Sequence, residues 1–395
     1  MLPNLNKPST VKKFKLYCLL VSMVSMLGFL SFAQDGDEVH SNAHDVEEQI
    51  HGEKHVMHQE EAEFDVAEMI MAHIADANEF HIAGNISFPL PVILWDKAEG
   101  LKFFLSSAFD HGHTAVDGFV MDHSVVKKVV GDFPAGKVDV EVHHGEVMYD
   151  GHHFATEGKS TILASSSFYD FSITKNVFTL LFTCTVLIFL FVGMARFYKK
   201  GNLVPKGIYA ALEPLILFVK EDIAIPNIGE KKHAKFLPYL LTVFFFIWLN
   251  NILGLIPFFP GGANLTGNIA LTFLLALITM IITNVYATKT YWGHIFNPAV
   301  PMALKPIMIP IEFIGVISKP FALMIRLFAN ISAGHILILS LLSLIFIFKS
   351  LMVAPVSIAF ALMMLMLEIL VGFLQAFIFT LLSALFIGLA QEEHH

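Results

Sequence analysis

Seven charged, imidazole or amide side chains interrupt the two apolar segments that end the sequence, residues 306–348 and 351–390. They are Glu312, Lys319, Arg326, Asn330, His335, Glu368 and Gln375. A charged side chain in the middle of a membrane costs about 2.5–3.5 kcal/mol on insertion scales, so such residues face a protein interior or a water-filled path. Carboxylate, imidazole and guanidinium groups in that setting are typical of a route for ions.

Arg326 carries the strongest signal of the seven. Its guanidinium stays charged at any accessible pH, and leucine, isoleucine and phenylalanine surround it in the sequence. Asn330 lies one helical turn after Arg326 and Lys319 two turns before it, so a helix would place all three on one face. We therefore expect Arg326 to be buried and to face the path of a translocated ion.

His335 and Glu368 are the candidates for passing protons, because both side chains can titrate near neutrality when they are buried or paired. Gln375 follows Glu368 by seven residues, which puts both on one side of a helix. Small residues beside the polar face allow another helix to approach closely; they are Ser332, Ala333 and Gly334. Asn330, Gln375 and Ser332 could instead serve only as hydrogen bonds between helices, and the sequence leaves that alternative open.

The elements that must position these residues are membrane helices. The chain of 395 residues is 55% hydrophobic and 15% charged, whereas soluble domains carry about 25% charged residues. Three earlier apolar runs have the length of about 20 residues that one crossing needs; they are Val177–Met194, Phe236–Ile256 and Asn268–Ala287. The two final segments are about twice that long, so each is either a helical hairpin or one steeply tilted helix. Neither contains a cluster of loop-forming residues, which favours two long, oblique, antiparallel helices.

The placement of charge predicts the orientation of these helices. Lysine and arginine residues follow the first span and precede the second, and Lys289 follows the third, whereas loop 257–267 contains neither residue type. By the positive-inside rule, loops 196–235 and 288–305 lie in the cytoplasm and loop 257–267 lies outside, which leaves the C-terminus in the cytoplasm. Residues 205–222 alternate apolar and charged positions, and we expect them to form an amphipathic helix at the membrane interface.

The first third of the sequence differs from the rest. Residues 1–33 contain lysines, a short apolar run and small residues before Gln34, which is typical of a cleaved signal peptide, with a retained membrane anchor as the alternative. Residues 34–172 are polar and hold most of the histidines. Short alternating runs within them predict strands. The expected architecture is a small, partly β extracytoplasmic domain at 34–172 and an all-α polytopic membrane domain of about five helices at 173–395.

Closely spaced histidines in the N-terminal region are candidate metal ligands; they are His111, His113, His143, His144, His152 and His153. A solvated surface rich in histidine, aspartate and glycine is the simpler interpretation, and no metal or other cofactor is expected. Gly158, Lys159 and Ser160 resemble the end of a nucleotide-binding loop, but His153 occupies the position of the required upstream glycine. We expect no nucleotide site or catalytic centre in this chain. The lack of a basic face argues against nucleic-acid binding.

The sequence around the arginine resembles a known family. The run Ser318–His335, with Arg-Leu-Phe-Ala-Asn at residues 326–330, is similar to the signature of subunit a of the F-type ATP synthases. Gln375–Phe379 resembles the second signature of that family, and Asn250–Pro257 resembles a segment that closes an earlier span. The resemblance covers residues 174–393. The N-terminal extension is similar to those of members from the Bacteroidetes group.

This resemblance implies a stator subunit in a bacterial inner membrane, beside a ring of c subunits and joined to the b subunits and catalytic ATPase head of the same complex. Protons would enter one aqueous half-channel, ride on ring carboxylates and leave through a second half-channel. Arg326 would separate the two, with Asn330 and Gln375 at the contact with the ring. His335 and Glu368 would line the extracytoplasmic half-channel.

Glu312 also stands where the family places an acid, but two features depart from the family pattern. Some bacterial members carry an acid at the position of His335 and a histidine at that of Glu368, and this exchange suggests that the two side chains touch. The long His-rich N-terminal region is absent from many members. A secondary transporter, which is usually built from two related halves with interrupted helices, and a membrane-anchored metal-binding protein are the alternative interpretations.

Overall fold

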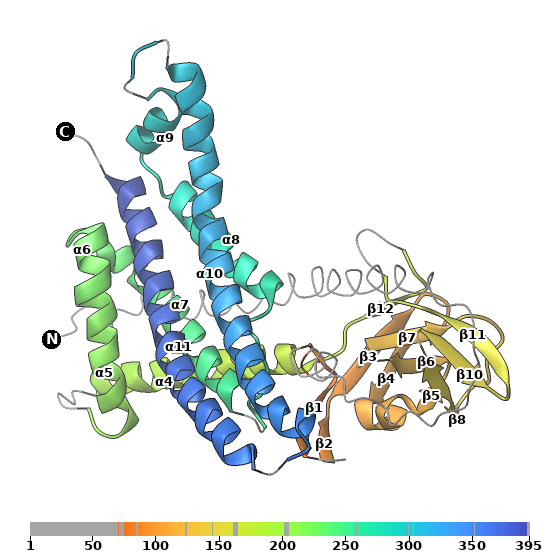
Figure 1. Ribbon diagram of the computed structural model, residues 1–395. Helices are drawn as coiled ribbons and strands as arrows, with labels where there is room; N and C mark the ends of the chain where they lie inside the picture. Colours follow the sequence, from red (N-terminus) through yellow and green to blue (C-terminus); the bar gives the residue numbers. More distant parts are fainter. Residues whose placement is uncertain are drawn as a thin grey trace.

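The chain folds into a β-rich unit followed by a bundle of helices, as the computed structural model in Figure 1 shows. The N-terminal region is β-rich, as the strand-like runs predict. The predicted signal peptide, residues 1–33, lies outside the described residues. The structure describes residues 70, 75–83, 86–122, 125–143, 145–160, 165–200, 205–256, 259–298, 300–302, 304–350 and 352–392.

The β-rich unit consists of antiparallel strands in three sheets. Its strands are β1 (Glu79–Ala83), β2 (Ile86–Pro89), β3 (Pro91–Asp96), β4 (Gly100–Leu105), β5 (Thr114–Val116), β6 (Phe119–Asp122), β7 (Val125–Val129), β8 (Lys137–Asp139), β9 (Glu141–His143), β10 (Glu146–Tyr149), β11 (His152–Glu157) and β12 (Phe168–Asp170). The sheets have the strand orders β1-β2, β8-β5-β6-β7-β11-β10-β9 and β12-β3-β4. A 3-10 helix, η1 (Ser106–Gly112), connects β4 to β5.

A hydrophobic core lies between the three-stranded sheet and the seven-stranded sheet. Val92 and Leu94 of β3 and Phe168 of β12 point into it and meet Phe119 and Val126 of β6 and β7. Successive side chains of a strand point to opposite faces, so the neighbours of these residues point to the outside of the three-stranded sheet.

The helical bundle begins four residues after β12. Its helices are α4 (Lys175–Lys199), α5 (Ile208–Phe218), the π-helix η2 (Val219–Ala224), α6 (Ile225–Ile228), α7 (His233–Leu255), α8 (Ile269–Val285), α9 (Lys289–Phe296), α10 (Lys305–Ile347) and α11 (Ala354–Gln391). Polar side chains cap several of them. Thr174 accepts a hydrogen bond from the Val177 N–H at the start of α4, and Asn268 accepts two N–H groups at the start of α8.

Four of the described helices, α4, α7, α10 and α11, are long and apolar enough to cross a membrane. A fifth span would combine α8 with α9, which meet at an angle of 101°. The last two segments are single continuous helices of 43 and 38 residues, so the hairpin alternative is wrong. At 1.5 Å per residue α10 is about 65 Å long. A helix of that length crosses a hydrocarbon layer of about 30 Å once only if it lies obliquely.

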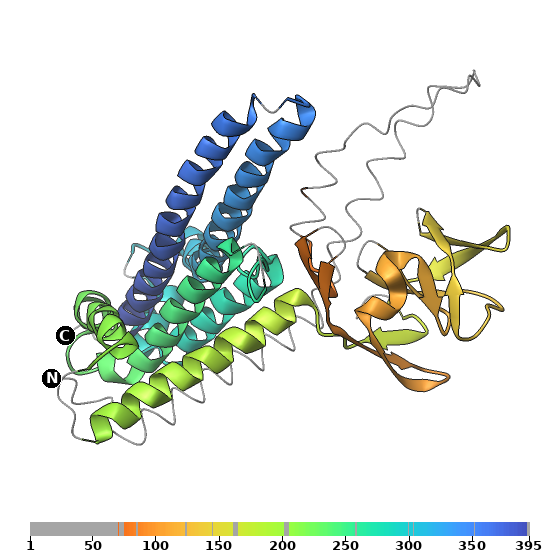
Figure 2. The ribbon, with the colours of Figure 1, turned by 90° about the horizontal axis from the view of Figure 1, so that it is seen from below.

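The bundle is built around α7, whose side chains are buried over most of its length. α4 and α11 pack against α7, and α10 packs against α8 and α11, as Figures 1 and 2 show. The expected interfacial helix at 205–222 corresponds to α5 and part of η2. Its apolar side packs into the bundle core through Ile216 and Val219. That side therefore faces protein, where we expected it to face lipid.

The β-rich unit is attached to one end of the bundle by the β1–β2 hairpin. Phe80 and Leu90 are buried against Phe178 of α4 and Ala263 of the loop between α7 and α8. The ring of Phe80 also lies edge-on to Phe178 and Phe259, with centroid separations of 5.5 and 5.4 Å. The start of α4 and the α7–α8 loop are therefore held together beneath the hairpin. The C-terminal end of α11 lies at the other end of the bundle, where the Thr288 N–H donates to Ala390 O.

Candidate functional site

Arg326 lies on the outer side of α10. The inner side of this helix carries Leu323, Leu327 and Ile331, which are buried in the bundle core, and a period of 3.6 residues places Arg326 and Asn330 on the other side. Both of these side chains are exposed. The expectation that Arg326 is buried is therefore wrong for the chain alone, because its helix turns the arginine away from the bundle.

The guanidinium of Arg326 has no carboxylate partner in the described part of the chain, where no ion pair involves it. Its exposed neighbours on the helix are apolar; Phe321 is 54% exposed and Ile325 is 42% exposed. An arginine in such surroundings is stable only if a partner or water supplies its hydrogen bonds. The outer face of α10 therefore presents a fixed positive charge to whatever packs against it.

His335 and Glu368 form a direct pair between α10 and α11. The Nδ1 atom of His335 lies 2.7 Å from Oε1 of Glu368, and the two side chains are 15% and 4% exposed. The other oxygen of Glu368, Oε2, is buried and has no hydrogen-bond partner among the described residues. That oxygen is therefore available to a hydrogen-bond donor such as water.

Two glycines allow the helices around this pair to approach closely. A Cβ atom on Gly334 would lie 2.6 Å from Oε1 of Glu368, so a side chain there would have to displace the Glu368 carboxylate. On α11, a Cβ atom on Gly372 would lie 3.1 Å from Cβ of Asn251. The amide of Asn251 donates to Gly372 O at 2.9 Å and accepts from Thr266 at 2.6 Å. A polar contact thus runs from the α7–α8 loop to the neighbourhood of Glu368.

Asn330 and Gln375 do not share one environment in this chain. Asn330 is exposed beside Arg326 on α10, whereas Gln375 is buried on α11 with 5% of its surface exposed. Gln375 lies seven residues after Glu368, and both are on the buried side of α11 as their spacing predicts. Gln375 therefore lies on the same side of α11 as Glu368, whereas Asn330 lies beside Arg326 on α10.

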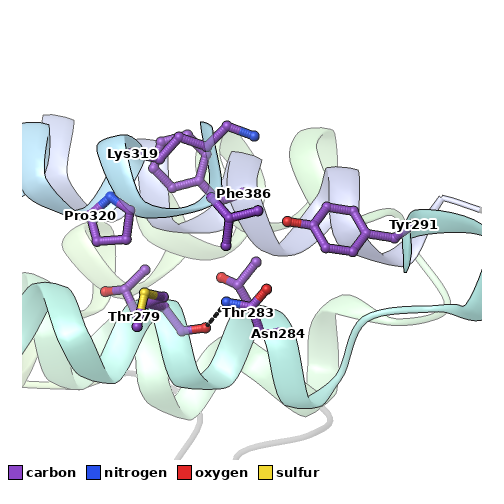
Figure 3. A pocket seen from close by; sticks show the side chains of 9 residues that line it. Thr279, Thr283, Asn284, Tyr291, Lys319, Pro320 and Phe386 are labelled. Carbon is purple, nitrogen blue, oxygen red and sulfur yellow. Dashed lines mark hydrogen bonds between the residues drawn. The ribbon is translucent and has the colours of Figure 1, made fainter. Parts of the chain in front are cut away.

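A second polar region lies at the other end of α10. A small cavity of about 20 Å³ is lined by α8, α9, α10 and α11, and Figure 3 shows its polar side chains. They are Thr279, Thr283 and Asn284 of α8, Tyr291 of α9 and Lys319 of α10. The ammonium of Lys319 lies 5.6 Å from the ring centroid of Phe386 on α11. Lys319 thus lines this cavity, on the same continuous helix as Arg326 and seven residues before it.

An open cavity of about 300 Å³ adjoins the first one and shares Tyr291 and Lys319 with it. Glu312 and His294 also line it, with Glu392 from the C-terminal end. The wider cavity extends to Glu392 near the C-terminal end of the bundle, and the smaller one extends to Pro320 of α10. Sequence reasoning missed the residues of α8 and α9, although Thr279 and Thr283 are one helical turn apart, which is a signal for a polar face.

Arg326 lies between the two polar regions along α10. His335 follows it by nine residues and Glu312 precedes it by fourteen, which correspond to about 13 Å and about 21 Å along a helix. The His335–Glu368 pair is near the α7–α8 loop, because a Cβ atom on Gly254 would lie 3.3 Å from Ala263 O and 3.6 Å from Nε2 of His335. One polar region thus faces the end that holds the β-rich unit, and the other faces the C-terminal end.

The candidate metal ligands are not gathered into a site. His111 pairs with Glu79 at 3.0 Å and His153 with Glu146 at 3.3 Å. Within the described residues no group of three or more histidine, cysteine or acidic side chains could hold a metal ion. His113 and His152 are among these described residues, and neither belongs to such a group. His144 and the side chain of His143 lie outside the described positions.

Known proteins resemble both parts of the chain. Residues 177–388 match the family model described as ATP synthase A chain, and residues 69–166 match a domain of unknown function. ATP synthase subunit a of Chloroherpeton thalassium is 44% identical over 265 residues, which cover 64% of this chain and 77% of the relative. The protein of that name from Chlorobium phaeobacteroides is 49% identical over 57% of this chain and 68% of its own length.

A longer match extends into the β-rich unit. ATP synthase subunit a 2 of Prosthecochloris aestuarii is 41% identical over 301 residues, which cover 74% of this chain and 85% of the relative. The family match includes Arg326, the His335–Glu368 pair and most of the second polar region. Since it covers more than half of the sequence and the relatives match over most of their length, this chain belongs to the ATP synthase A chain family.

Proposed function

We propose that Arg326 separates two half-channels in this chain, which acts as the proton-translocating stator subunit a of an F-type ATP synthase. The observation that carries the proposal is the exposed guanidinium, which has no counter-charge in the described chain and lies between two polar regions that open toward opposite ends of the bundle. A channel that ran straight through the chain would place its polar groups in one continuous line. Here the two polar regions are separate, and Arg326 lies between them on the outer face of α10.

The His335–Glu368 pair belongs to the extracytoplasmic half-channel. The pair lies near the α7–α8 loop, which carries no lysine or arginine at residues 257–267, as the positive-inside rule requires of an outer loop. A carboxylate with one oxygen bonded to an imidazole and the other free can take a proton from water and pass it on. Glu368 and His335 would therefore deliver protons to the face that Arg326 occupies.

The two cavities beside α8 and α9 belong to the cytoplasmic half-channel. Hydroxyl and amide groups of Thr283, Asn284 and Tyr291 can hold a chain of water molecules. Glu312 and His294 line the wider mouth, where a carboxylate and an imidazole can take up the released protons. The positive charge of Lys319 lies between this mouth and Arg326. It disfavours the presence of a proton in the inner part of the half-channel, because like charges repel.

The rotating partner supplies the missing counter-charge. A carboxylate on each subunit of a c ring, carried past the outer face of α10, would meet the Arg326 guanidinium in its ionised form, because an opposite charge favours the ionised state. The approaching protonated carboxyl therefore gives its proton to water in the exit half-channel. After it passes the arginine, it takes a proton from the entry half-channel. Asn330, which is exposed beside Arg326, would contact the ring at this step. Gln375 is buried on α11, so the ring contact expected for it from the family resemblance is not available in this chain alone.

The membrane arrangement follows from the same assignment. The chain spans a bacterial plasma membrane several times, with residues 34–172 on the outer side, the C-terminus in the cytoplasm and residues 1–33 removed as a signal peptide. The b subunits and the catalytic head would hold it against the ring. No nucleotide is handled by this chain.

The test is ATP-driven proton pumping in inverted membrane vesicles that contain the complete complex with Arg326→Ala. We expect pumping to be lost while the complex still assembles with its c ring. Ser318→Ala is the matched control, because Ser318 is exposed on the same helix and its hydroxyl bonds only to Gly315 O of that helix. Pumping by Arg326→Ala at the rate of the control would overturn the proposal.

A further inference from the structure

The outer face of the three-stranded sheet β12-β3-β4 is apolar and uncovered. Its side chains are 41% to 64% exposed. They are Trp95, Leu101, Phe103, Leu105, Tyr169 and Phe171. The surface of a monomeric soluble protein rarely carries so many large apolar side chains in one patch. We therefore expect another molecule to cover this face. We call it the outer apolar face.

The strand register makes these residues one continuous surface. Trp95 of β3 is paired directly with Leu101 of β4 on one side and with Tyr169 of β12 on the other. Phe103 pairs with Ile93, one step further along the same face. Directly paired residues on neighbouring strands have their Cβ atoms about 5 Å apart on the same side of the sheet. The outer apolar face therefore runs across all three strands without a polar interruption.

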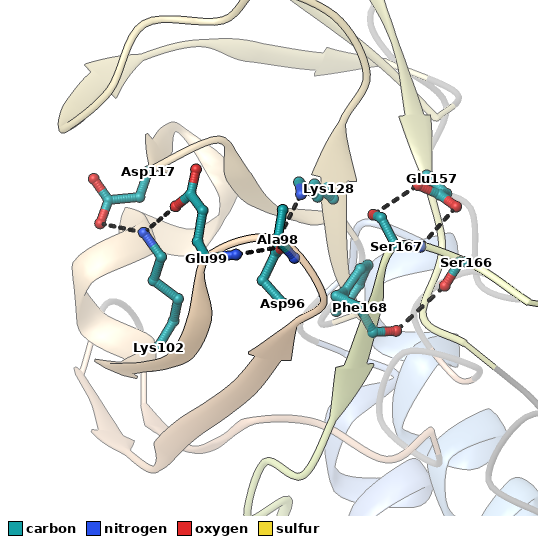
Figure 4. A network of polar contacts seen from close by, with 10 residues as sticks. All are labelled: Asp96, Ala98, Glu99, Lys102, Asp117, Lys128, Glu157, Ser166, Ser167 and Phe168. Atoms are coloured by element: carbon teal, nitrogen blue, oxygen red, sulfur yellow. Dashed lines mark hydrogen bonds and ion pairs between the residues drawn. The ribbon is translucent and has the colours of Figure 1, made fainter.

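The inner face of the same sheet is fixed, so the outer face cannot turn inward. Asp96 is 1% exposed and forms an ion pair with Lys128 of β7, as Figure 4 shows. Burial alone would raise the pKa of Asp96, but the bonds from Lys128 and from the Ala98 and Glu99 N–H groups hold that pKa below its ordinary value. Ser167, at the start of β12, is bonded to Glu157 of β11. These contacts lock the sheet onto the rest of the β-rich unit.

The outer apolar face is continuous with the first membrane helix. Phe171 donates its N–H to Ile93 O, and Ile173 donates to Pro91 O, so the strand pairing continues almost to α4. Four residues separate Phe171 from Lys175, a reach of at most about 14 Å. Figure 2 shows the β3–β4 hairpin turning sideways from the end of α4. A sheet attached in this way lies beside the point where α4 enters the bilayer.

The chemistry of the face fits a phospholipid surface. Tryptophan and tyrosine are the residues that prefer the boundary between headgroups and acyl chains, and leucine and phenylalanine beside them can enter the upper acyl region. At the edge of the face, the ammonium of Lys97 lies 5.3 Å from the ring centroid of Tyr169. A cation at that level can bond to lipid phosphate, as lysines near membrane interfaces do.

We propose that the outer apolar face inserts into the outer leaflet of the membrane beside α4. The β-rich unit then rests on the lipid as a second anchor, in addition to the β1–β2 hairpin that attaches it to the bundle. This assignment rests on α4 spanning the membrane and on the proposed orientation, with the β-rich unit on the outer side, and it is independent of the role of Arg326.

The test measures how deep this face lies in the assembled complex, reconstituted into phosphatidylcholine–phosphatidylglycerol liposomes. Nitroxide labels are placed at Phe103→Cys and, separately, at Leu101→Cys in an otherwise cysteine-free complex. Val130→Cys is the matched control, because Val130 is an equally apolar residue that is 51% exposed elsewhere on the β-rich unit. Labels are challenged with oxygen, which concentrates in lipid, and with a water-soluble nickel chelate.

We expect oxygen to relax the labels at 101 and 103 severalfold more than the nickel chelate does, and the reverse order at 130. Two results would overturn the proposal. Equal access of the nickel chelate to 103 and 130 would mean that the face is open to water. Poor access of both reagents to 101 and 103 would mean that a protein covers it. Because the labelled side chains are exposed, failure to fold is not expected, and assembly of each labelled complex with its c ring checks this.

Discussion

Arg326 and Glu368 both lie in apolar helices, but the surroundings of their side chains differ. Glu368 is 4% exposed, and its Oε1 atom lies 2.7 Å from Nδ1 of His335. Arg326 is exposed and has no ion pair among the described residues. Burial without a partner would cost several kcal/mol for either charge, so Glu368 is stabilised from within and Arg326 must be stabilised from outside. This difference supports the separate roles proposed for the two positions.

Changes at His335 and Glu368 are expected to be strongly coupled. Glu368→Gln and His335→Ala should each slow ATP-driven proton flux by about tenfold or more, because a hydrogen bond to a charged group contributes about 1.5–3 kcal/mol. The double variant should be little slower than the slower single variant, since both changes remove the same contact. Initial rates of vesicle acidification measure all three. If the fold-reduction in proton flux of the double variant equals the product of the two single fold-reductions, the two residues act separately.

Gly334 is expected to tolerate no side chain. A Cβ atom there would lie 2.6 Å from Oε1 of Glu368, so Gly334→Ala should push Glu368 away from His335 and slow proton flux severalfold. Gly315→Ala is the matched control, since it is also a glycine within α10 and nothing lies within 4 Å of its added Cβ. That control should keep wild-type flux and gain about 0.5–1 kcal/mol of helix stability. Equal flux in the two variants would contradict the close packing.

At the scale of elements, the junction between the β-rich unit and α4 combines an apolar and a polar contact. Phe80 packs against Phe178 and Phe259, and Oδ1 of Asp76 accepts hydrogen bonds from the Ala77 and Asn176 N–H groups. The Lys175 N–H donates to Ala77 O. Asp76 therefore satisfies N–H groups at the start of α4 that would otherwise lack partners.

Burial raises the pKa of the Asp76 carboxyl above its ordinary value, although bonds from Thr174, Asn176 and Ala77 and the charge of Lys175 oppose the shift. A group that binds its proton more tightly when folded loses stability as pH rises. The loss begins near the unfolded pKa of 3.8 and is complete above the raised one. Asp76→Asn keeps an acceptor oxygen without the charge, so it removes this loss.

We therefore expect the thermal midpoint of Asp76→Asn to exceed that of wild type at pH 7, with a difference that shrinks as pH falls toward 4. Scanning fluorimetry of the purified complex across this range measures it. Asp76→Ala, which lacks the acceptor, should be less stable than wild type at both pH values. A difference between the Asp76→Asn variant and the wild-type protein that does not change with pH would contradict the assignment of a raised pKa.

For the whole molecule, the two longest helices could be predicted because residues 306–348 and 351–390 contain no loop-forming cluster, and α10 and α11 are indeed unbroken. The contact between His335 and Glu368 could be anticipated from the family resemblance, because other members carry the acid and the histidine exchanged between these two positions. The exposure of Arg326 could not, because a sequence does not show which face of a helix is left for another protein. The outer apolar face was missed for a related reason. Its residues belong to three strands whose pairing spans more than seventy positions.

The polar cavity between α8 and α11 shows the same limit. Thr279 is fully buried and bonds to Tyr239, forty residues away, at 2.6 Å. Threonines are ordinary in apolar helices because the hydroxyl can bond to the preceding turn, so Thr279 and Thr283 do not stand out until the helices are packed. Lys319 lies on α10 together with Arg326, but its contact with Phe386 of α11 could not be predicted from its spacing.

The barrier assigned to Arg326 is tested most directly by passive proton conductance. Vesicles that contain the complex are stripped of the catalytic head, and proton flow through the remaining membrane sector is measured under an imposed potential. With Arg326→Ala we expect conductance at or above the wild-type value, because both half-channels remain and the charge between them is gone. A membrane sector with its c ring bound but a conductance reduced to background would contradict this account, since it would make Arg326 part of the proton path.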